Sequence, residues 1–130
     1  MEGLIIGQDR NTPDVNFNPK SGVFEIKGRS FPENSKKFYE PVLSWLDAYL
    51  ASESKANKVS VHFELFYVSS SSIISILEII KRLNIMHENG AVVSIEWRYD
   101  EDDEDIRKIG EDYKKLTPIN FEFAANSGVS

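Results

Sequence analysis

Cysteine is absent from the 130-residue chain, and acidic residues outnumber basic ones. Without cysteine there is no disulfide framework, no thiolate nucleophile and no zinc site with cysteine ligands. The formal net charge of −6 argues against nucleic acid or an anionic membrane surface as the main partner. Lysine and arginine are also scattered, as in Lys36-Lys37 and Lys114-Lys115, and form no single basic stripe. Proteins and small ligands remain as partners.

Long apolar runs are missing as well. No stretch is long enough to span a bilayer, and the N-terminus lacks the charged-then-apolar pattern of a signal peptide. We therefore expect a cytoplasmic protein that does not bind membranes. The sequence has no internal repeat, and its length suits one hydrophobic core, so residues 1–130 are predicted to form a single domain.

The most strongly patterned part of the chain is a strand followed directly by a helix. Apolar and polar residues alternate from Val59 to Leu65, which predicts a strand with one buried face. Four serines follow at 69–72, and a largely apolar segment then predicts a buried helix from about Ser70 to Glu88. Free backbone N–H groups at a helix N-terminus favour a hydroxyl cap or an anion. On this pattern alone, ordinary N-capping is favoured over a phosphorylated hydroxyl.

Shorter patterned segments predict the remaining elements. Alternation predicts a candidate edge strand in an N-terminal extension (residues 1–20) and three further strands, at Leu4–Ile6, Gly22–Gly28, Val93–Tyr99 and Ile119–Phe123. A helix from Asn34 or Ser35 to about Ala51 is expected to bury Phe38, Val42, Trp45, Leu46 and Tyr49. A helix opening in the acidic segment 100–105 and ending at Lys114-Lys115 is expected to bury Ile106, Ile109, Tyr113 and Leu116. Residues 125–130 are expected to form a loose tail.

The predicted strands all carry polar residues on one side. Parallel strands that are covered on both faces read instead as continuous apolar runs. We therefore predict an α/β domain of two layers. About three helices lie mainly on one face of a mixed sheet of four to five strands, and the other face is open.

The acidic segment is a weak candidate for a metal site. Asp100, Asp102, Glu104 and Glu111 have the spacing of EF-hand positions one, three, five and twelve, but Asp105 stands where the glycine at position six is required. Successive residues at a helix start also point in different directions. We expect a solvated helix start that the helix dipole favours, with no metal and no other cofactor.

The two histidines offer no catalytic constellation. His62 lies on the polar side of a predicted strand, His87 lies near a helix end, and neither has a nucleophile or ligand partner nearby in sequence. A small enzyme built on Glu64, His62 and the acidic segment is therefore the disfavoured alternative.

Four short motifs resemble those of a known family. They are Thr12-Pro13, Phe31-Pro32-Glu33-Asn34-Ser35, Leu65-Phe66-Tyr67-Val68-Ser69-Ser70-Ser71-Ser72 and Trp97-Arg98-Tyr99-Asp100. The order of elements resembles the STAS fold of anti-sigma-factor antagonists, in which an Asp-Ser-Ser-Gly motif opens the central helix and its first serine is phosphorylated. Within that similarity, the motifs more closely resemble the SiaC family of bacterial regulatory phosphoproteins, from about Thr12 to Phe123.

The resemblance implies a regulator that switches partners and is not itself an enzyme. In the SiaC family, a dedicated protein kinase phosphorylates one hydroxyl at the start of the central helix, and a metal-dependent serine/threonine phosphatase reverses this. The unphosphorylated form binds and activates a GGDEF-type diguanylate cyclase, which controls cyclic-di-GMP and biofilm formation. The alternative that the STAS resemblance allows is an anti-sigma-factor antagonist of a partner-switching system.

Matching the serine motif residue by residue implies that Ser70 is the phosphorylated residue, with Ser71 next. The chain departs from the pattern, because Ser69 and Ser70 stand where close relatives have Asn and Thr, and Ser72 replaces the STAS glycine. Loops at the carboxyl ends of parallel strands meet at one edge of a sheet. We therefore expect partner contacts from residues at this edge, namely Glu33, Asn34, Ser69, Ser71, Ser72 and Tyr99.

Overall fold

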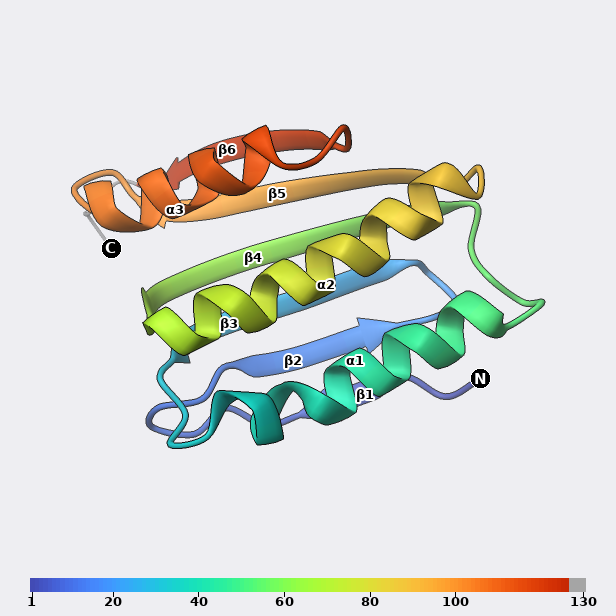
Figure 1. Ribbon diagram of the computed structural model, residues 1–130, viewed down its shortest axis with the longest axis horizontal. Helices are drawn as coiled ribbons and strands as arrows, with labels where there is room; N and C mark the ends of the chain where they lie inside the picture. Colours follow the sequence, from blue (N-terminus) through green and yellow to red (C-terminus); the bar gives the residue numbers. More distant parts are fainter. Residues whose placement is uncertain (127–130) are drawn as a thin grey trace.

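The computed structural model describes residues 1–126, which form six strands and three helices (Figure 1). The strands are β1 (Leu4–Ile6), β2 (Asp14–Asn18), β3 (Val23–Ser30), β4 (Lys58–Val68), β5 (Val92–Asp100) and β6 (Asn120–Asn126). The helices are α1 (Ser35–Ala51), α2 (Ser70–Glu88) and α3 (Glu104–Lys115). No helix in the described part is long and apolar enough to cross a membrane.

The strands lie in the sheet in the same order as in the chain, from β1 to β6. The β1–β2 and β2–β3 pairs are antiparallel, whereas β3, β4, β5 and β6 are mutually parallel. Each parallel crossover advances by one strand in the same direction, and such crossovers share one hand, so their helices lie on the same face. Figure 1 shows all three helices in front of the sheet. The predicted two-layer mixed α/β fold is confirmed, with six strands in place of four to five.

The additional strand is β2, which lies in the N-terminal extension. Its Val15 and Phe17 are buried, and Phe17 stacks on Phe24 of β3 with ring centroids 4.8 Å apart. The sequence pattern was too short to reveal this strand, because only two apolar residues alternate between Pro13 and Pro19. The predicted edge strand at Leu4–Ile6 is confirmed as β1, which pairs with β2.

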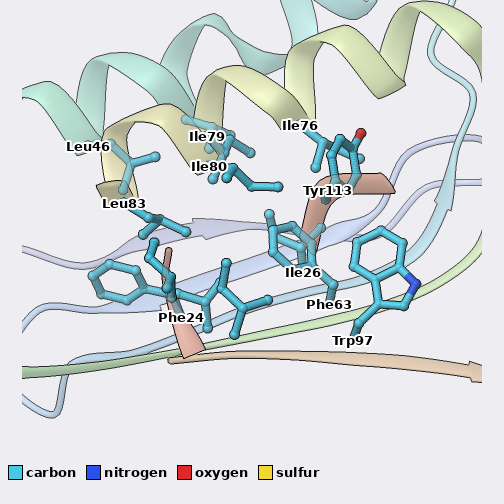
Figure 2. Close-up of a cluster of buried hydrophobic side chains, with 14 of the residues drawn as sticks. Phe24, Ile26, Leu46, Phe63, Ile76, Ile79, Ile80, Leu83, Trp97 and Tyr113 are labelled. Atoms are coloured by element: carbon cyan, nitrogen blue, oxygen red, sulfur yellow. The ribbon is translucent and has the colours of Figure 1, made fainter. Parts of the chain in front are cut away.

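The main hydrophobic core lies between the sheet and the helices. Figure 2 shows side chains of α2 pointing toward those of the strands, among them Ile76, Ile79, Ile80, Leu83, Phe24, Ile26 and Phe63. Trp97 of β5 is fully buried and donates a hydrogen bond from Nε1 to the Ile106 carbonyl oxygen (2.9 Å). This bond fixes α3 on the sheet.

The buried faces of α1 and α3 differ in part from prediction. In α1, Tyr39 is fully buried, whereas Phe38 and Trp45 are only partly buried. In α3, the prediction for Leu116 is wrong, because its side chain is 61% exposed. Leu116 is the C-cap of α3, where the chain leaves the helix and no longer follows its buried stripe.

The C-terminal prediction is also corrected in part. Ala125 and Asn126 belong to β6 and pair with Tyr99 and Asp100 of β5, so parallel pairing continues beyond the last alternating residue. The rest of the predicted tail, residues 127–130, lies outside the described residues.

The sheet face opposite the helices carries a row of polar and charged side chains. Lys27 Nζ lies 3.5 Å from Glu64 Oε2, and His62 Nδ1 lies 3.0 Å from Glu96 Oε1. Arg98 also donates to Glu96 Oε1 (2.5 Å). The hydrogen bond from Arg98, followed by the one from His62, lowers the pKa of Glu96 below its ordinary value. The polar side of the strands therefore forms the open face, as predicted.

Candidate functional site

Helix α2 begins at Ser70, as the sequence predicts, and Ser69 is its N-cap. The Ser69 hydroxyl accepts a hydrogen bond from the Ser72 backbone N–H (3.2 Å), and its carbonyl oxygen accepts one from the Ile73 N–H (3.0 Å). The Ser69 N–H donates to the Ser30 carbonyl oxygen at the end of β3 (2.9 Å). The start of α2 is thus held by its own cap and by the neighbouring strand.

Behind this cap lies a set of hydrogen-bonded hydroxyls that we call the hydroxyl cluster, formed by Ser30, Ser35, Tyr39, Ser69, Ser71 and Ser72. At its centre, the fully buried Ser72 hydroxyl accepts from Ser30 Oγ (2.8 Å) and Ser69 Oγ (2.9 Å) and donates to the Ser30 carbonyl oxygen (3.1 Å). The Tyr39 hydroxyl lies 2.6 Å from Ser30 Oγ. Burial raises the pKa of Tyr39 to about 12, against a smaller lowering by the Ser30 hydrogen bond.

The hydroxyl cluster also joins α1 to α2. Ser35 is the first residue of α1, and its Oγ lies 2.9 Å from Ser71 Oγ and 3.2 Å from Ser72 Oγ. Ser71 is exposed, yet its hydroxyl is engaged by Ser35 and lies 3.3 Å from Ser69 Oγ. Within the described residues, no buried side-chain polar atom lacks a hydrogen-bond partner.

Ser70 differs from the other three serines of the run. Its side chain is exposed, and its hydroxyl forms no hydrogen bond with any residue of the described part of the chain. As the first residue of α2, Ser70 also lies beside backbone N–H groups that have no partner within the helix. These groups and the helix dipole favour an exposed anion by about 0.3–1 kcal/mol. Among the four serines, Ser70 therefore combines an exposed side chain with a hydroxyl that is free of the hydroxyl cluster.

A groove between the N-terminal parts of α1 and α2 lies beside the serines. Its lining includes Glu33, Asn34, Tyr39, Leu43, Ser71, Ile74 and Glu78. Ile74 is 66% exposed, and it lies four residues after Ser70, which places both residues on the same face of α2. Figure 1 shows the starts of α1 and α2 at the same edge of the sheet. Glu33 and Asn34 therefore lie on the same side of the molecule as the serines.

Two of the predicted contact residues have a structural role at a helix start. Asn34 is the N-cap of α1, and its side chain accepts a hydrogen bond from the Lys37 N–H (3.1 Å). Ser72 is fully buried. We therefore assign Ser72 to holding the first turn of α2, since its side chain cannot reach a partner. Tyr99 packs near Phe123 of β6, with ring centroids 6.4 Å apart. Tyr99 lies near the carboxyl end of β5, the parallel neighbour of β4, and within residues 1–126 no hydrogen bond joins it to the hydroxyl cluster.

The acidic segment runs from the end of β5, at Asp100, to the first turn of α3. The Asp103 side chain caps this helix by accepting from the Ile106 N–H (3.0 Å), and Glu104 and Asp105 lie in the first turn. Within residues 1–126, no three His, Asp or Glu side chains come together as metal ligands. The N-cap and first-turn roles account for these acidic residues.

The hydroxyl cluster predicts a difference in stability between neighbouring serines. We expect Ser72→Ala to lower the free energy of unfolding by about 1–3 kcal/mol, because the buried Ser30 hydroxyl and the partly buried Ser69 hydroxyl lose their shared partner. Ser70→Ala removes an exposed hydroxyl without a partner, so we expect the free energy of unfolding to change by less than about 0.5 kcal/mol. Urea unfolding of the two variants measures the difference. Equal losses would contradict the stabilising role of the cluster.

The fold and site define a class of protein, a small two-layer α/β domain with an exposed hydroxyl at the start of its central helix. The family follows from comparison with known proteins. The profile of the SiaC family regulatory phosphoproteins matches residues 6–126, and the chain therefore belongs to the SiaC family.

Relatives from Pseudomonas aeruginosa match over nearly the whole chain. An uncharacterised protein of strain UCBPP-PA14 is 28% identical over 126 residues, which cover 97% of this chain and 98% of that protein. The crystal structure of apo-SiaC is 26% identical, with a TM-score of 0.86 over 96% of this chain and 100% of that one. A chain in the crystal structure of the diguanylate cyclase SiaD in complex with its activator SiaC is 27% identical, with a TM-score of 0.86. That match covers 95% of this chain and 99% of the other.

Proposed function

We propose that this chain is a partner-binding regulator that is switched by phosphorylation of Ser70. The unphosphorylated form binds and activates a diguanylate cyclase, a partner protein kinase adds the phosphate, and a metal-dependent serine/threonine phosphatase removes it. The chain itself catalyses no reaction. The observation that carries the proposal is the exposed Ser70 hydroxyl on the first turn of α2. The complex of SiaD with its activator SiaC supports the choice of partner.

A phosphate at Ser70 can act without unfolding the domain. It adds about −1.5 to −2 charges and three acceptor oxygens, which the N-terminus of α2 favours. A partner that covers the same corner would instead enclose this dianion in an interface. An uncompensated buried charge costs several kcal/mol, which corresponds to orders of magnitude in Kd. The phosphate thus blocks binding directly and needs no large conformational change.

The neighbouring serines are less suited to this role. A phosphate on Ser71 would replace its hydroxyl hydrogen bond to Ser35 and disturb the contact between α1 and α2. Ser72 is fully buried, and Ser69 caps α2. Modification at these positions would disturb the first turn, whereas modification of Ser70 would leave the hydroxyl cluster intact. Ser71 remains the second candidate because its side chain is exposed.

The partner contacts that we propose lie along the groove. Glu33, Asn34 and Ser71 are among its lining residues, and the exposed Ile74 supplies an apolar surface one turn from Ser70. A partner element seated on Ile74 would pass beside the Ser70 hydroxyl. Phosphorylation would then introduce its charge at the edge of an apolar contact. Tyr99, near the end of β5, is the further contact that we propose.

The site assignment is tested by incubating the protein with its cognate kinase and ATP. Intact-mass measurement and peptide mapping are expected to show one phosphate on wild type and Ser71→Ala, and none on Ser70→Ala. The Ser71→Ala variant is the matched control, since it removes a hydroxyl one residue away. Undiminished phosphate on Ser70→Ala would move the modification to another residue.

A further inference from the structure

Near its end, β4 contains a β-bulge that changes which side chains face outward. Gly28 of β3 lies opposite Leu65, and the next residue, Arg29, lies opposite Tyr67, so Phe66 is an extra residue in β4. Phe66 and Tyr67 are 44% and 43% exposed, so two successive residues face outward on a strand whose buried and less buried residues otherwise alternate. Bulges re-aim side chains and are frequent beside functional sites. This bulge exposes two successive aromatic residues.

A third aromatic residue and a cation complete an exposed surface, which we call the aromatic cluster (Arg29, Phe31, Phe66 and Tyr67). The Phe31 ring is 48% exposed and lies 5.4 Å from the Tyr67 ring, centroid to centroid. The Arg29 guanidinium carbon lies 5.5 Å from the Tyr67 ring centroid. Aromatic residues and arginine are enriched at the energetic centres of protein interfaces. The composition therefore indicates a surface for a protein partner.

The aromatic cluster shares one corner of the molecule with Ser70. Ser30 is the last residue of β3 and lies between Arg29 and Phe31 in the chain, and its carbonyl oxygen accepts a hydrogen bond from the Ser69 N–H (2.9 Å). Ser69 directly precedes Ser70, and Tyr67 lies only three residues before it. A protein seated on the aromatic cluster would thus reach the start of α2.

We propose that the aromatic cluster anchors the diguanylate cyclase, which meets it with an apolar surface bearing a carboxylate beside Arg29. This inference rests on the proposed function. An activator must remain bound, which requires anchoring residues, whereas a kinase or phosphatase needs only transient contact. The charges of Arg29 and of a phosphate on Ser70 also favour the cyclase as the partner. A carboxylate that pairs with Arg29 would be repelled by a dianion on Ser70, whereas a basic partner would be attracted by it.

The test measures the Kd of the purified cyclase for the full chain and its variants. We expect Phe31→Ala and Tyr67→Ala each to weaken binding by about 30-fold or more, as for anchoring residues in general. Arg29→Glu is expected to weaken it as well, because it places a negative charge opposite the partner's carboxylate. Ile85→Ala is the matched control, since Ile85 is also 44% exposed but lies near the other end of α2. Ile85→Ala is expected to bind as wild type does.

Phosphorylation of the same variants by the cognate kinase supplies the second readout. Unchanged phosphorylation of Ser70 in Phe31→Ala and Tyr67→Ala would show that both variants fold and that the kinase does not use the cluster. Wild-type affinity of both variants for the cyclase would overturn the inference and leave the proposed function standing. Loss of phosphorylation with retained cyclase binding would also overturn it and assign the cluster to the kinase. Failure of wild type to bind the cyclase would overturn the proposed function and, with it, this anchor.

Discussion

Phosphorylation of Ser70 is expected to weaken binding of the diguanylate cyclase by about 100-fold or more, since an uncompensated charge in a buried interface costs about 3–5 kcal/mol. The charge enters at the corner that joins the groove to the aromatic cluster, so it affects both proposed contact surfaces. Isothermal titration calorimetry of kinase-treated and untreated protein against the cyclase measures the change in Kd. Product formation by the cyclase should fall in parallel.

The controls distinguish the effect of the phosphate on binding from an effect of damage to the fold. Ser70→Ala is expected to bind the cyclase as wild type does and to be unaffected by the kinase. Treatment with the phosphatase should restore the affinity of the modified protein. The phosphate should change the free energy of unfolding by no more than about 1 kcal/mol, because the N-terminus of α2 tolerates an anion. A phosphorylated protein that keeps wild-type affinity would refute the switch.

Gly22→Ala is expected to lower the free energy of unfolding by about 2–4 kcal/mol, from left-handed backbone strain and overpacking together. Gly22 has φ +74°, and a Cβ added there would lie 2.2 Å from the carbonyl oxygen of Lys58. That oxygen belongs to the backbone at the start of β4, so it cannot move as a flexible side chain would. The Gly22 carbonyl oxygen also accepts the Ser60 N–H (2.8 Å), which begins the pairing of β3 with β4.

Gly90→Ala is the matched control for this prediction. Gly90 has φ +102°, but an added Cβ would meet nothing within 4 Å, so the substitution introduces backbone strain without a contact. Gly90→Ala is expected to lower the free energy of unfolding by about 1–2 kcal/mol. Urea unfolding followed by tryptophan fluorescence compares the two variants. Equal losses would mean that the Lys58 backbone moves aside at little cost.

Periodicity predicted the elements that carry a long, regular pattern. The alternation from Val59 to Leu65 predicted β4, because a strand with one buried face alternates apolar and polar residues. The apolar segment after the serines predicted α2 and its start at Ser70, because a helix buried on several sides is apolar over most of its surface. β2 escaped prediction, since Val15 and Phe17 alone alternate there between two prolines. Its burial depends on pairing with β3, which is a tertiary contact.

The site was predicted less completely than the fold. The serine run indicated the start of α2, but Ser30 and Tyr39 join the hydroxyl cluster from other elements, and a serine or tyrosine in isolation gives no sign of its partner. The bulge was also invisible, because strict alternation would turn Phe66 outward and Tyr67 inward. A single extra residue in one strand reverses the direction of Tyr67 and is set by the pairing with β3.

The order of the strands has a consequence for how the molecule assembles. From β2 onward, every strand pairs with the strand that precedes it in the chain, so no strand waits for a partner that is made later than its next neighbour. The hydroxyl cluster draws only on residues 30–72, and the aromatic cluster only on residues 29–67. Neither contains a residue from β5, α3 or β6. Both clusters are therefore encoded in the first part of the chain to leave the ribosome.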